Sequence, residues 1–353
     1  MIDPAPFIDY IDWSNHANSL YEKGETNLAL GAAITAASLA RTPGTLLNLA
    51  VINETQGEFR HALALYKEAH ALAPDDKLVA CGYFHALVRM GRFKDAWKLS
   101  YAHADWGWVN RIWPEWDGIT SLAGKRLLVL SGGGYGDNIL FLRWMPRLKA
   151  LGAHVTFMCP PSLHSLLAGT LGIDRLIAGS IAGLEGMLLP ADYDCFTCLL
   201  TLGKHFCPTV EDIPTEPYIA GRKSPVWRVG FCTRAGEEKS PRRHRSLTPE
   251  QVKRIRAILG AWVDLDFDAP TTWKHTAATL SNIELIVTVD TGVAHLAGAM
   301  NIPCWVILPG FSASYYGIDG DRNSFYPSQR LFRNGGEGME NSVADVCCAL
   351  EKL

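Results

Sequence analysis

The first hundred residues carry a helical pattern of apolar positions that recurs along the chain. In residues 57–74, GEFRHALALYKEAHALAP, a glycine is followed by apolar residues at helical spacing, and a proline closes the segment. Part of this frame recurs from Gly24, 33 residues earlier, and from Gly91, 34 residues later. A helix pair with one apolar face buries that face by stacking on a neighbouring pair. The pattern therefore predicts three stacked helix pairs over about residues 8–105, with a non-repeating helical bundle as the alternative.

After Lys125 the pattern changes to alternating strands and helices. Short apolar runs typical of buried parallel strands occupy 126–132, 153–160, 173–179, 227–233, 263–269, 283–290 and 303–309. Helical spacing fits 138–152, 162–172, 247–259 and 341–353, and Thr248 and Pro249 are a fitting N-cap and first residue for the third of these. The proline-rich passage 207–225 is the expected linker between two Rossmann-like lobes.

The predicted organisation is an α-helical repeat domain followed by an α/β unit of two lobes. The boundaries are 1–110 for the helical repeats, 120–215 for the N-terminal lobe and 225–353 for the C-terminal lobe. The connector 106–125 contains four tryptophans, which either pack the repeats onto the lobes or offer stacking surfaces to a ligand; packing is the favoured interpretation. Ligands of such sheets bind at the carboxyl ends of the strands, so the loops at those ends are the places to look for a site.

The first such loop is S-G-G-G-Y-G-D-N, residues 131–138. It matches neither the G-x-G-x-x-G pattern nor a P-loop, but its glycines, Gly134 and Gly136 among them, let backbone amides face a ligand at a helix N-terminus. Asp137 and Asn138 follow. Asp137 has two interpretations of equal weight: an N-cap, or a general base that takes a proton from an acceptor hydroxyl.

The second loop lies within IVTVDTGVAHLAGAMNIP, residues 286–303. The strand is expected to end at Asp290, and Thr291 and Gly292 then present a hydroxyl and amides at a helix N-terminus, which suits a phosphate. His295 lies one turn into the helix and can reach the same anion. A lone histidine is more often a packed core residue, but this frame favours a ligand-binding role.

The third loop, TRAGEEKSPRRHRSL, spans residues 233–247 and concentrates positive charge at Lys239, Arg242, Arg243 and Arg245. Its position after a strand favours a clamp for a diphosphate that gains negative charge as it departs. A solvated basic loop and a contact to a nucleic-acid backbone are the alternatives.

These motifs support two resemblances. The 33–34 residue period, with glycine at the interhelix turn and alanine at the crossing points, resembles the tetratricopeptide repeat. Residues 115–335 resemble the heptosyltransferase-like glycosyltransferases, on the entry WDG…LAGKRLLVL, the G-x-G-D-N-I-L-F-L-R-W loop, the V-D-T-G-V-A-H-L-A-G-A block, the R-R-x-R-S-L segment and the late F-Y-P-S-Q-R-L-F-R. The second resemblance implies a GT-B fold, a sugar-nucleotide donor, no metal or other cofactor, and inversion at the anomeric carbon.

The resemblance also implies residue roles. Asp137 matches the catalytic base, and Asp290, Thr291, Gly292 and His295 match the donor-binding block, with Thr291 and Gly292 on the diphosphate. The basic loop matches the diphosphate-facing region. The segment between the helix 247–259 and the D-T-G block is shorter than is usual in the family, so the sugar and the nucleotide stay open.

The acceptor stays open as well. A protein held by the helical repeats, a glycan, and a hydroxylated base in nucleic acid are the three classes, and the net charge of −3 disfavours the last. A repeat scaffold with a nucleotide-sensing lobe is the rival that is not an enzyme. No apolar run is long enough for a membrane span, and nine scattered cysteines, with Cys195 and Cys198 as small hydrophobes rather than metal ligands, favour a cytoplasmic protein.

Overall fold

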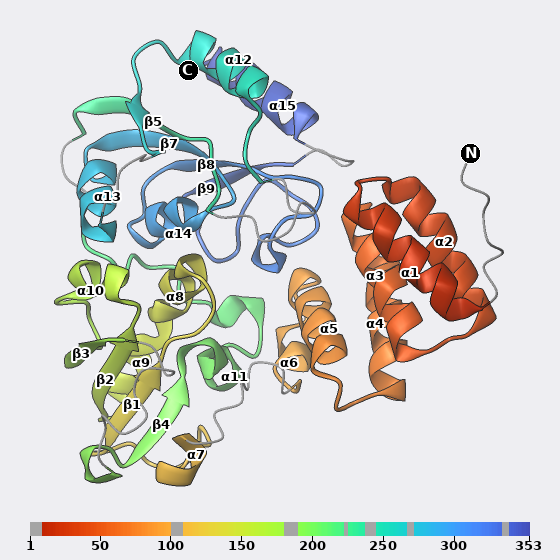
Figure 1. The fold of residues 1–353 in the computed structure, drawn as a ribbon. Coiled ribbons are helices and arrows are strands. Elements are labelled where there is room, and N and C mark those ends of the chain that lie inside the picture. The colour runs from red at the N-terminus through yellow and green to blue at the C-terminus, as the bar shows by residue number, and fades with distance from the viewer. Residues whose placement is uncertain are drawn as a thin grey trace.

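The computed structural model describes residues 9–99, 109–179, 190–221, 225–236, 245–266, 272–333 and 339–353. The ribbon in Figure 1 shows a helical region beside two α/β lobes, and α5 (Lys77–Arg89) and α6 (Phe93–Ala96) are the helices of this region that lie nearest the lobes. No helix in these ranges is long and apolar enough to cross a bilayer.

Three helix pairs form the helical region, as the repeated frame predicted. They are α1 (Tyr10–Glu22) with α2 (Thr26–Leu39), α3 (Pro43–Thr55) with α4 (Phe59–Leu72), and α5 with α6. Gly24, Gly57 and Gly91 occupy the three turns within the pairs, with φ of 78°, 82° and 71°, a conformation that favours glycine. Alanines line the crossing points; Ala29, Ala33, Ala62 and Ala69 are all buried.

The N-terminal lobe holds a parallel sheet of order β3-β2-β1-β4. Its strands are β1 (Arg126–Leu130), β2 (His154–Cys159), β3 (Arg175–Ala178) and β4 (Cys195–Cys198), and its helices are α7 (Val109–Ile112), α8 (Tyr135–Phe141), α9 (Met145–Ala150), α10 (Pro161–Leu167) and α11 (Leu202–Phe206). The chain leaves β1 toward β2 on one side and later returns to β4 on the other. The loop after β1 therefore lies where the strand order reverses, which is the place where such sheets bind ligands.

The C-terminal lobe holds a second parallel sheet, of order β6-β5-β7-β8-β9. Its strands are β5 (Trp227–Cys232), β6 (Val263–Asp264), β7 (Ile283–Val289), β8 (Cys304–Ile307) and β9 (Gln329–Phe332), and its helices are α12 (Pro249–Leu259), α13 (Trp273–Leu280), α14 (Gly292–Ala299) and α15 (Glu340–Leu350). The strand order reverses between β5 and β7. The basic loop after β5 and the D-T-G block after β7 consequently start from the same point of the sheet edge.

One predicted helix is wrong in detail. The segment 138–152 was expected to be continuous, but α8 begins at Tyr135 and ends at Phe141, a 3₁₀ turn covers Leu142–Trp144, and α9 follows. Pro146 accounts for the break, since it has no N–H to donate and its ring clashes with the carbonyl four residues before it. The capping prediction for α12 is confirmed, because Thr248 accepts a hydrogen bond from Gln251 N.

Other segments also differ from the sequence pattern. The strand expected over 263–269 covers only Val263–Asp264 of its described part, and the helix expected over 162–172 ends at Leu167. Helix α13 and strand β9 were not predicted.

The tryptophan-rich connector packs against the N-terminal lobe. Trp113 is 2% exposed and lies edge-on to Tyr193, and Trp116 is 5% exposed and stacks near His205. The packing interpretation is therefore confirmed for these two side chains, while Trp106 and Trp108 lie outside the described residues. Cys195 and Cys198 lie in β4, where burial raises the pKa of both thiols to about 11, as expected for packed rather than reactive cysteines.

Candidate functional site

The loop after β1 folds back on itself through Asp137. Gly134 is the N-cap of α8, and its N–H donates to Asp137 Oδ2 at 2.8 Å. Asp137 is thus the third residue of the helix, closing a capping-box bond, and the N-cap role considered from the sequence is wrong. Gly133 has φ of 67°, and a Cβ there would lie 2.6 Å from Asp137 Oδ2, so glycine is required for this arrangement.

The bond from Gly134 uses only one of the two carboxylate oxygens of Asp137. Within the described ranges, no hydrogen bond reaches its Oδ1. Burial raises the pKa of Asp137 above 3.8, with Asp290 adding to the effect, whereas the Gly134 N–H, His295 and Arg245 oppose it. A desolvated carboxylate with a raised pKa is a stronger proton acceptor than an ordinary aspartate.

Asn138 holds the glycine loop in place. Its side-chain amide donates to Gly132 O at 2.9 Å and to Gly134 O at 2.8 Å, and the residue is 1% exposed. Asn138 is therefore a positioning residue for the loop that carries Asp137 and has no surface to offer a ligand. Its neighbour Gly136 lies against His295 of the other lobe.

On the C-terminal lobe, α14 starts at the end of β7 with its first turn open. Thr291 is the N-cap, and its hydroxyl makes no capping bond. Gly292 is the first helical residue, so its amide and the next have no partner within the helix. Asp290 is 2% exposed and accepts a hydrogen bond from Ala313 N at 3.2 Å, which ties the loop after β8 to the same corner.

Arg245 is the described member of the basic loop, and it lies at this corner. Its Nη1 donates to Asp290 O at 3.2 Å and lies 3.8 Å from Asp290 Oδ2. The side chain is 28% exposed, so it is available to an incoming ligand. Lys239, Arg242 and Arg243 lie outside the described residues.

His295, in α14 of the C-terminal lobe, contacts α8 of the N-terminal lobe. It is 6% exposed, and its Nδ1 lies 3.3 Å from Tyr326 Oη. A Cβ on Gly136 would lie 2.7 Å from His295 Cδ2 and 3.3 Å from Nε2, so the imidazole edge packs directly on the first turn of α8. Burial lowers the pKa of His295 despite the nearby carboxylates of Asp290 and Asp137, which favours a neutral ring.

An aromatic pair that the sequence did not reveal covers the same region. Trp273, at the start of α13, lies against Gly292, where a Cβ would be 2.5 Å from Trp273 Cη2. Its ring centroid is 5.5 Å from that of Tyr135, the first residue of α8 on the other lobe. In the sequence, this pair could have been suspected only from the single tryptophan in the short segment before the D-T-G block, which shows no helical spacing of apolar residues.

Arg143 is a second residue that the sequence did not single out. It is 2% exposed and donates to Leu140 O, to Pro214 O in the interlobe linker, and to Phe325 O in the C-terminal lobe. Its guanidinium lies 4.6 Å from the ring centroid of Tyr326, whose hydroxyl lies 3.3 Å from His295 Nδ1. Arg143 therefore fixes both lobes and the linker in one arrangement behind the site.

The arrangement brings together a carboxylate on one lobe and, on the other, an open helix N-terminus that would suit an anion, called the anion seat below. Asp137 is contributed by the loop after β1, and Thr291, Gly292 and Arg245 by the loops after β7 and β5. His295 and Gly136 form the contact between the two helices. This geometry suits the transfer of a group from a phosphorylated donor to a hydroxyl.

Comparison with known proteins points in the same direction. The sequence model described as glycosyltransferase family 9 (heptosyltransferase) matches residues 240–307, which include the D-T-G block. No protein of curated function matches the chain.

Solved structures that a search finds similar to this chain include a glycosyl transferase family 9 protein from Veillonella parvula, with 13% identity, a TM-score of 0.46, and coverage of 67% of this chain and 92% of that one. They also include the ADP-heptose lipopolysaccharide heptosyltransferase II of E. coli, with 14% identity, a TM-score of 0.44 and coverage of 64% and 99%. The O-GlcNAc transferase of Thermobaculum terrenum has 14% identity and a TM-score of 0.28 over 98% of this chain and 90% of that one. The chain is thus similar to glycosyltransferase family 9 over the segment that contains the D-T-G block, and its described residues form helix pairs followed by two parallel α/β sheets.

Proposed function

We propose that the protein is an inverting, metal-independent glycosyltransferase that moves a sugar from a nucleoside-diphosphate sugar to an acceptor hydroxyl. The observation that carries the proposal is the half-buried carboxylate of Asp137, which has one oxygen without a described partner and lies beside the contact between α8 and α14. A carboxylate there faces the lobe that offers the anion seat. The proposed acceptor classes are a protein, a glycan and a hydroxylated nucleic-acid base.

The proposed reaction is one displacement. Asp137 takes the proton of the acceptor hydroxyl as its oxygen bonds to the anomeric carbon, and the bond from that carbon to the diphosphate oxygen breaks. Attack opposite the leaving group inverts the anomeric configuration. The nucleoside diphosphate leaves with the bonding electron pair.

The departing diphosphate gains negative charge, and the first turn of α14 is suited to receive it. Amides at a helix N-terminus and the Thr291 hydroxyl donate hydrogen bonds, and Arg245 supplies a positive charge beside them. We also assign His295 to this donor site, as a neutral ring. Lys239, Arg242 and Arg243 are proposed to complete the clamp.

The rival is a repeat scaffold whose lobes sense a nucleotide without turning it over. Asp137 and an open α14 N-terminus both argue against it, since a sensor needs no proton acceptor. Hydrolysis of sugar nucleotides in the absence of acceptor separates the two: slow release of nucleoside diphosphate supports an enzyme, and its absence with every common donor supports the scaffold. Unchanged turnover in excess EDTA would support metal independence.

The test of the base is Asp137→Asn. The amide oxygen can still accept the Gly134 hydrogen bond, so the variant should fold, while turnover should fall at least a hundredfold because general base catalysis typically contributes that much. Asp76→Asn, at the exposed N-cap of α5, is the matched control and should keep full turnover. An Asp137→Asn protein with wild-type turnover would remove Asp137 from the reaction.

A further inference from the structure

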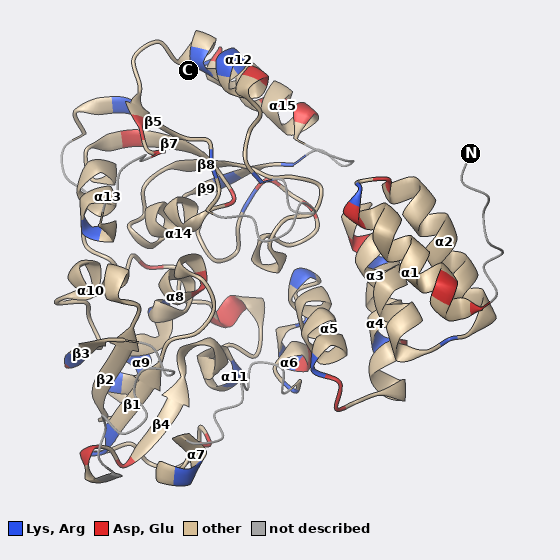
Figure 2. Cartoon of the chain, viewed as in Figure 1, with Lys and Arg blue, Asp and Glu red and all other residues tan. Residues whose placement is uncertain are grey.

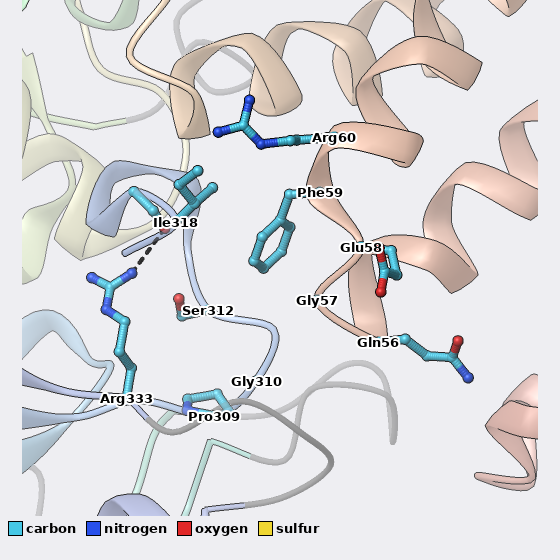
Figure 3. Close-up of a pocket in the computed structure, with 11 residues that line it drawn as sticks. Gln56, Gly57, Glu58, Phe59, Arg60, Pro309, Gly310, Ser312, Ile318 and Arg333 are labelled. Atoms are coloured by element: carbon cyan, nitrogen blue, oxygen red, sulfur yellow. Dashed lines mark hydrogen bonds between the residues drawn. The ribbon is translucent and has the colours of Figure 1, made fainter. Parts of the chain in front are cut away.

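A pocket of about 380 Å³ lies where the second helix pair meets the C-terminal lobe. Figure 3 shows its two walls: the turn from Gly57 to Arg60 at the start of α4, and the loop from Pro309 to Ile318 together with Arg333. The pocket thus belongs to neither part alone. Its size is at the lower end of the range typical of small-molecule sites.

The pocket lies at a functional edge of the lobe. Its loop follows β8, and Arg333 follows β9, so both come from the carboxyl ends of parallel strands. The same loop reaches the candidate site, because Ala313 N donates to Asp290 Oδ2 at 3.2 Å. A molecule bound in this pocket would therefore contact the same loop that contacts Asp290.

The charges lining the pocket favour an anion. Arg333 is half-buried, and its guanidinium donates to Gly317 O at 3.1 Å and to Tyr316 O, while its buried Nε has no hydrogen-bond partner. Within the described ranges it forms no ion pair with a carboxylate, and burial lowers its pKa. Asp319 lies close enough to oppose this lowering, but the described hydrogen bonds of the guanidinium go only to carbonyls, so an anionic ligand would stabilise this desolvated cation further. Arg60 lies at the rim and adds a second positive charge.

The remaining groups favour a sugar. The ring of Phe59 faces Gly310 across the pocket, with Arg89 at 4.8 Å from its centroid. An aromatic face packs against the C–H face of a pyranose, and Gln56 and Ser312 offer polar groups for hydroxyls. We propose that the pocket binds a carboxylated or phosphorylated sugar unit of the acceptor, so that helical repeats and C-terminal lobe hold the acceptor together. This inference rests on the proposed function.

A glycan fits these features better than a peptide or a nucleic acid. The pocket is small and walled on two sides, whereas an extended polymer backbone needs a continuous groove. A nucleic-acid backbone would also require several cations in line, and the described lining contains two arginines and Glu58. The other two classes become outcomes of the test.

The experiment is a calorimetric titration of the full chain with glucose 6-phosphate, glucuronate, glucose, inorganic phosphate and a short oligoglutamate peptide. We expect the two anionic sugars to bind and glucose to bind at least tenfold more weakly. Arg60→Gln and Arg333→Lys should each weaken the anionic sugars at least fivefold. Arg330→Gln, an exposed arginine on β9 that stacks on Trp305, is the control and should leave affinity unchanged.

Each contrary result has a definite meaning. Equal affinity of the wild type and both arginine variants would overturn the site. Inorganic phosphate binding as tightly as glucose 6-phosphate would overturn the assignment to a sugar, and a tighter oligoglutamate would replace it with an acidic protein. Arg60 is on the surface and does not hold the fold, so its variant keeps the test valid if Arg333→Lys is unstable. Because binding is read directly, a protein that binds anionic sugars but transfers none contradicts the proposed function and not this pocket.

Discussion

At the scale of single residues, the site depends on where burial changes acid–base behaviour. Asp137 is held between a backbone N–H that stabilises its charge and a desolvated surrounding that opposes it, and the second effect is the larger. His295 experiences the same desolvation with the opposite result, since a buried imidazole loses its proton more easily. Burial therefore disfavours charge on both side chains, raising the pKa of the Asp137 carboxyl and lowering the pKa of the His295 imidazole.

The proposed role of Asp137 makes a prediction about the pH dependence of turnover. A general base works only when ionised, so kcat/KM should fall as the pH drops through its pKa, and this limb should lie above the 3.8 of an ordinary aspartate. The measurement is a pH–rate profile over the range in which the wild type stays folded. An acidic limb at or below pH 3.8 would contradict the raised pKa.

The stability of the protein should respond to Asp137 in the opposite sense to an ordinary salt-bridged aspartate. Between the unfolded pKa and the raised folded pKa, the folded state binds more protons, so this group makes unfolding free energy decline as pH rises through that window. Asp137→Asn should flatten that slope. The control is the same titration on Asp76→Asn.

At the scale of elements, helices α8, α13 and α14 build the site by meeting at their first turns. Gly136 admits His295, and Gly292 admits Trp273, so each glycine is a place where one element lies directly on another. Tyr135 and Trp273 then close the gap between lobes from the outside. Neither α13 nor its tryptophan was evident from periodicity, because an eight-residue helix contains only about two turns.

Replacing Trp273 tests this aromatic cover. Trp273→Ala should weaken nucleoside-diphosphate binding or turnover by about tenfold, because the ring both packs on the α14 N-terminus and meets Tyr135. Trp273→Phe should retain most of the function. Trp262→Ala, which removes a ring that packs against Arg256 and Phe231, serves as the control for loss of a tryptophan. A Trp273→Ala protein with unaltered kinetics and affinity would exclude the aromatic pair from the site.

At the scale of the whole molecule, the repeats are joined to both lobes by buried polar contacts. Arg89 Nη2 donates to Ser312 O at 2.8 Å, and Trp97 Nε1 donates to Cys207 O at 2.9 Å. Glu54 lies 3.6 Å from Arg89 and accepts from Tyr66 at 2.9 Å, all three residues being buried. Figure 2 shows acidic and basic residues interspersed along the ribbon of the described residues.

Removing the charge of Glu54 should loosen the repeats from the lobes. Glu54→Gln leaves Arg89 as a buried charge with a neutral neighbour, which should cost about 3 kcal/mol of unfolding free energy. Urea unfolding and limited proteolysis measure the loss. Glu68→Gln breaks the exposed pair with Arg41 and should cost less than about 1 kcal/mol. Equal losses in the two variants would contradict a special role for the buried pair.

The sequence by itself determined the repeat period, the type of most elements and the loops in which a site is proposed. Glycine, alanine and apolar spacing are local properties, which is why the turns at Gly24, Gly57 and Gly91 and the cap of α12 were predictable. The family resemblance likewise depends on contiguous motifs. The roles assigned to Asp137, Thr291, Gly292 and His295 remain predictions that the experiments above test.

Only the tertiary structure decided which of these loops meet. The strand order places the loop after β1, the basic loop and the D-T-G block at sheet edges where the order reverses, and strand order has no local signature. Contacts between distant residues, such as His295 on Gly136 and Trp273 on Gly292, depend on how helices pack. The break at Pro146, the interlobe role of Arg143 and the pocket beneath Phe59 follow from the same fact: packing joins residues that lie far apart in the chain.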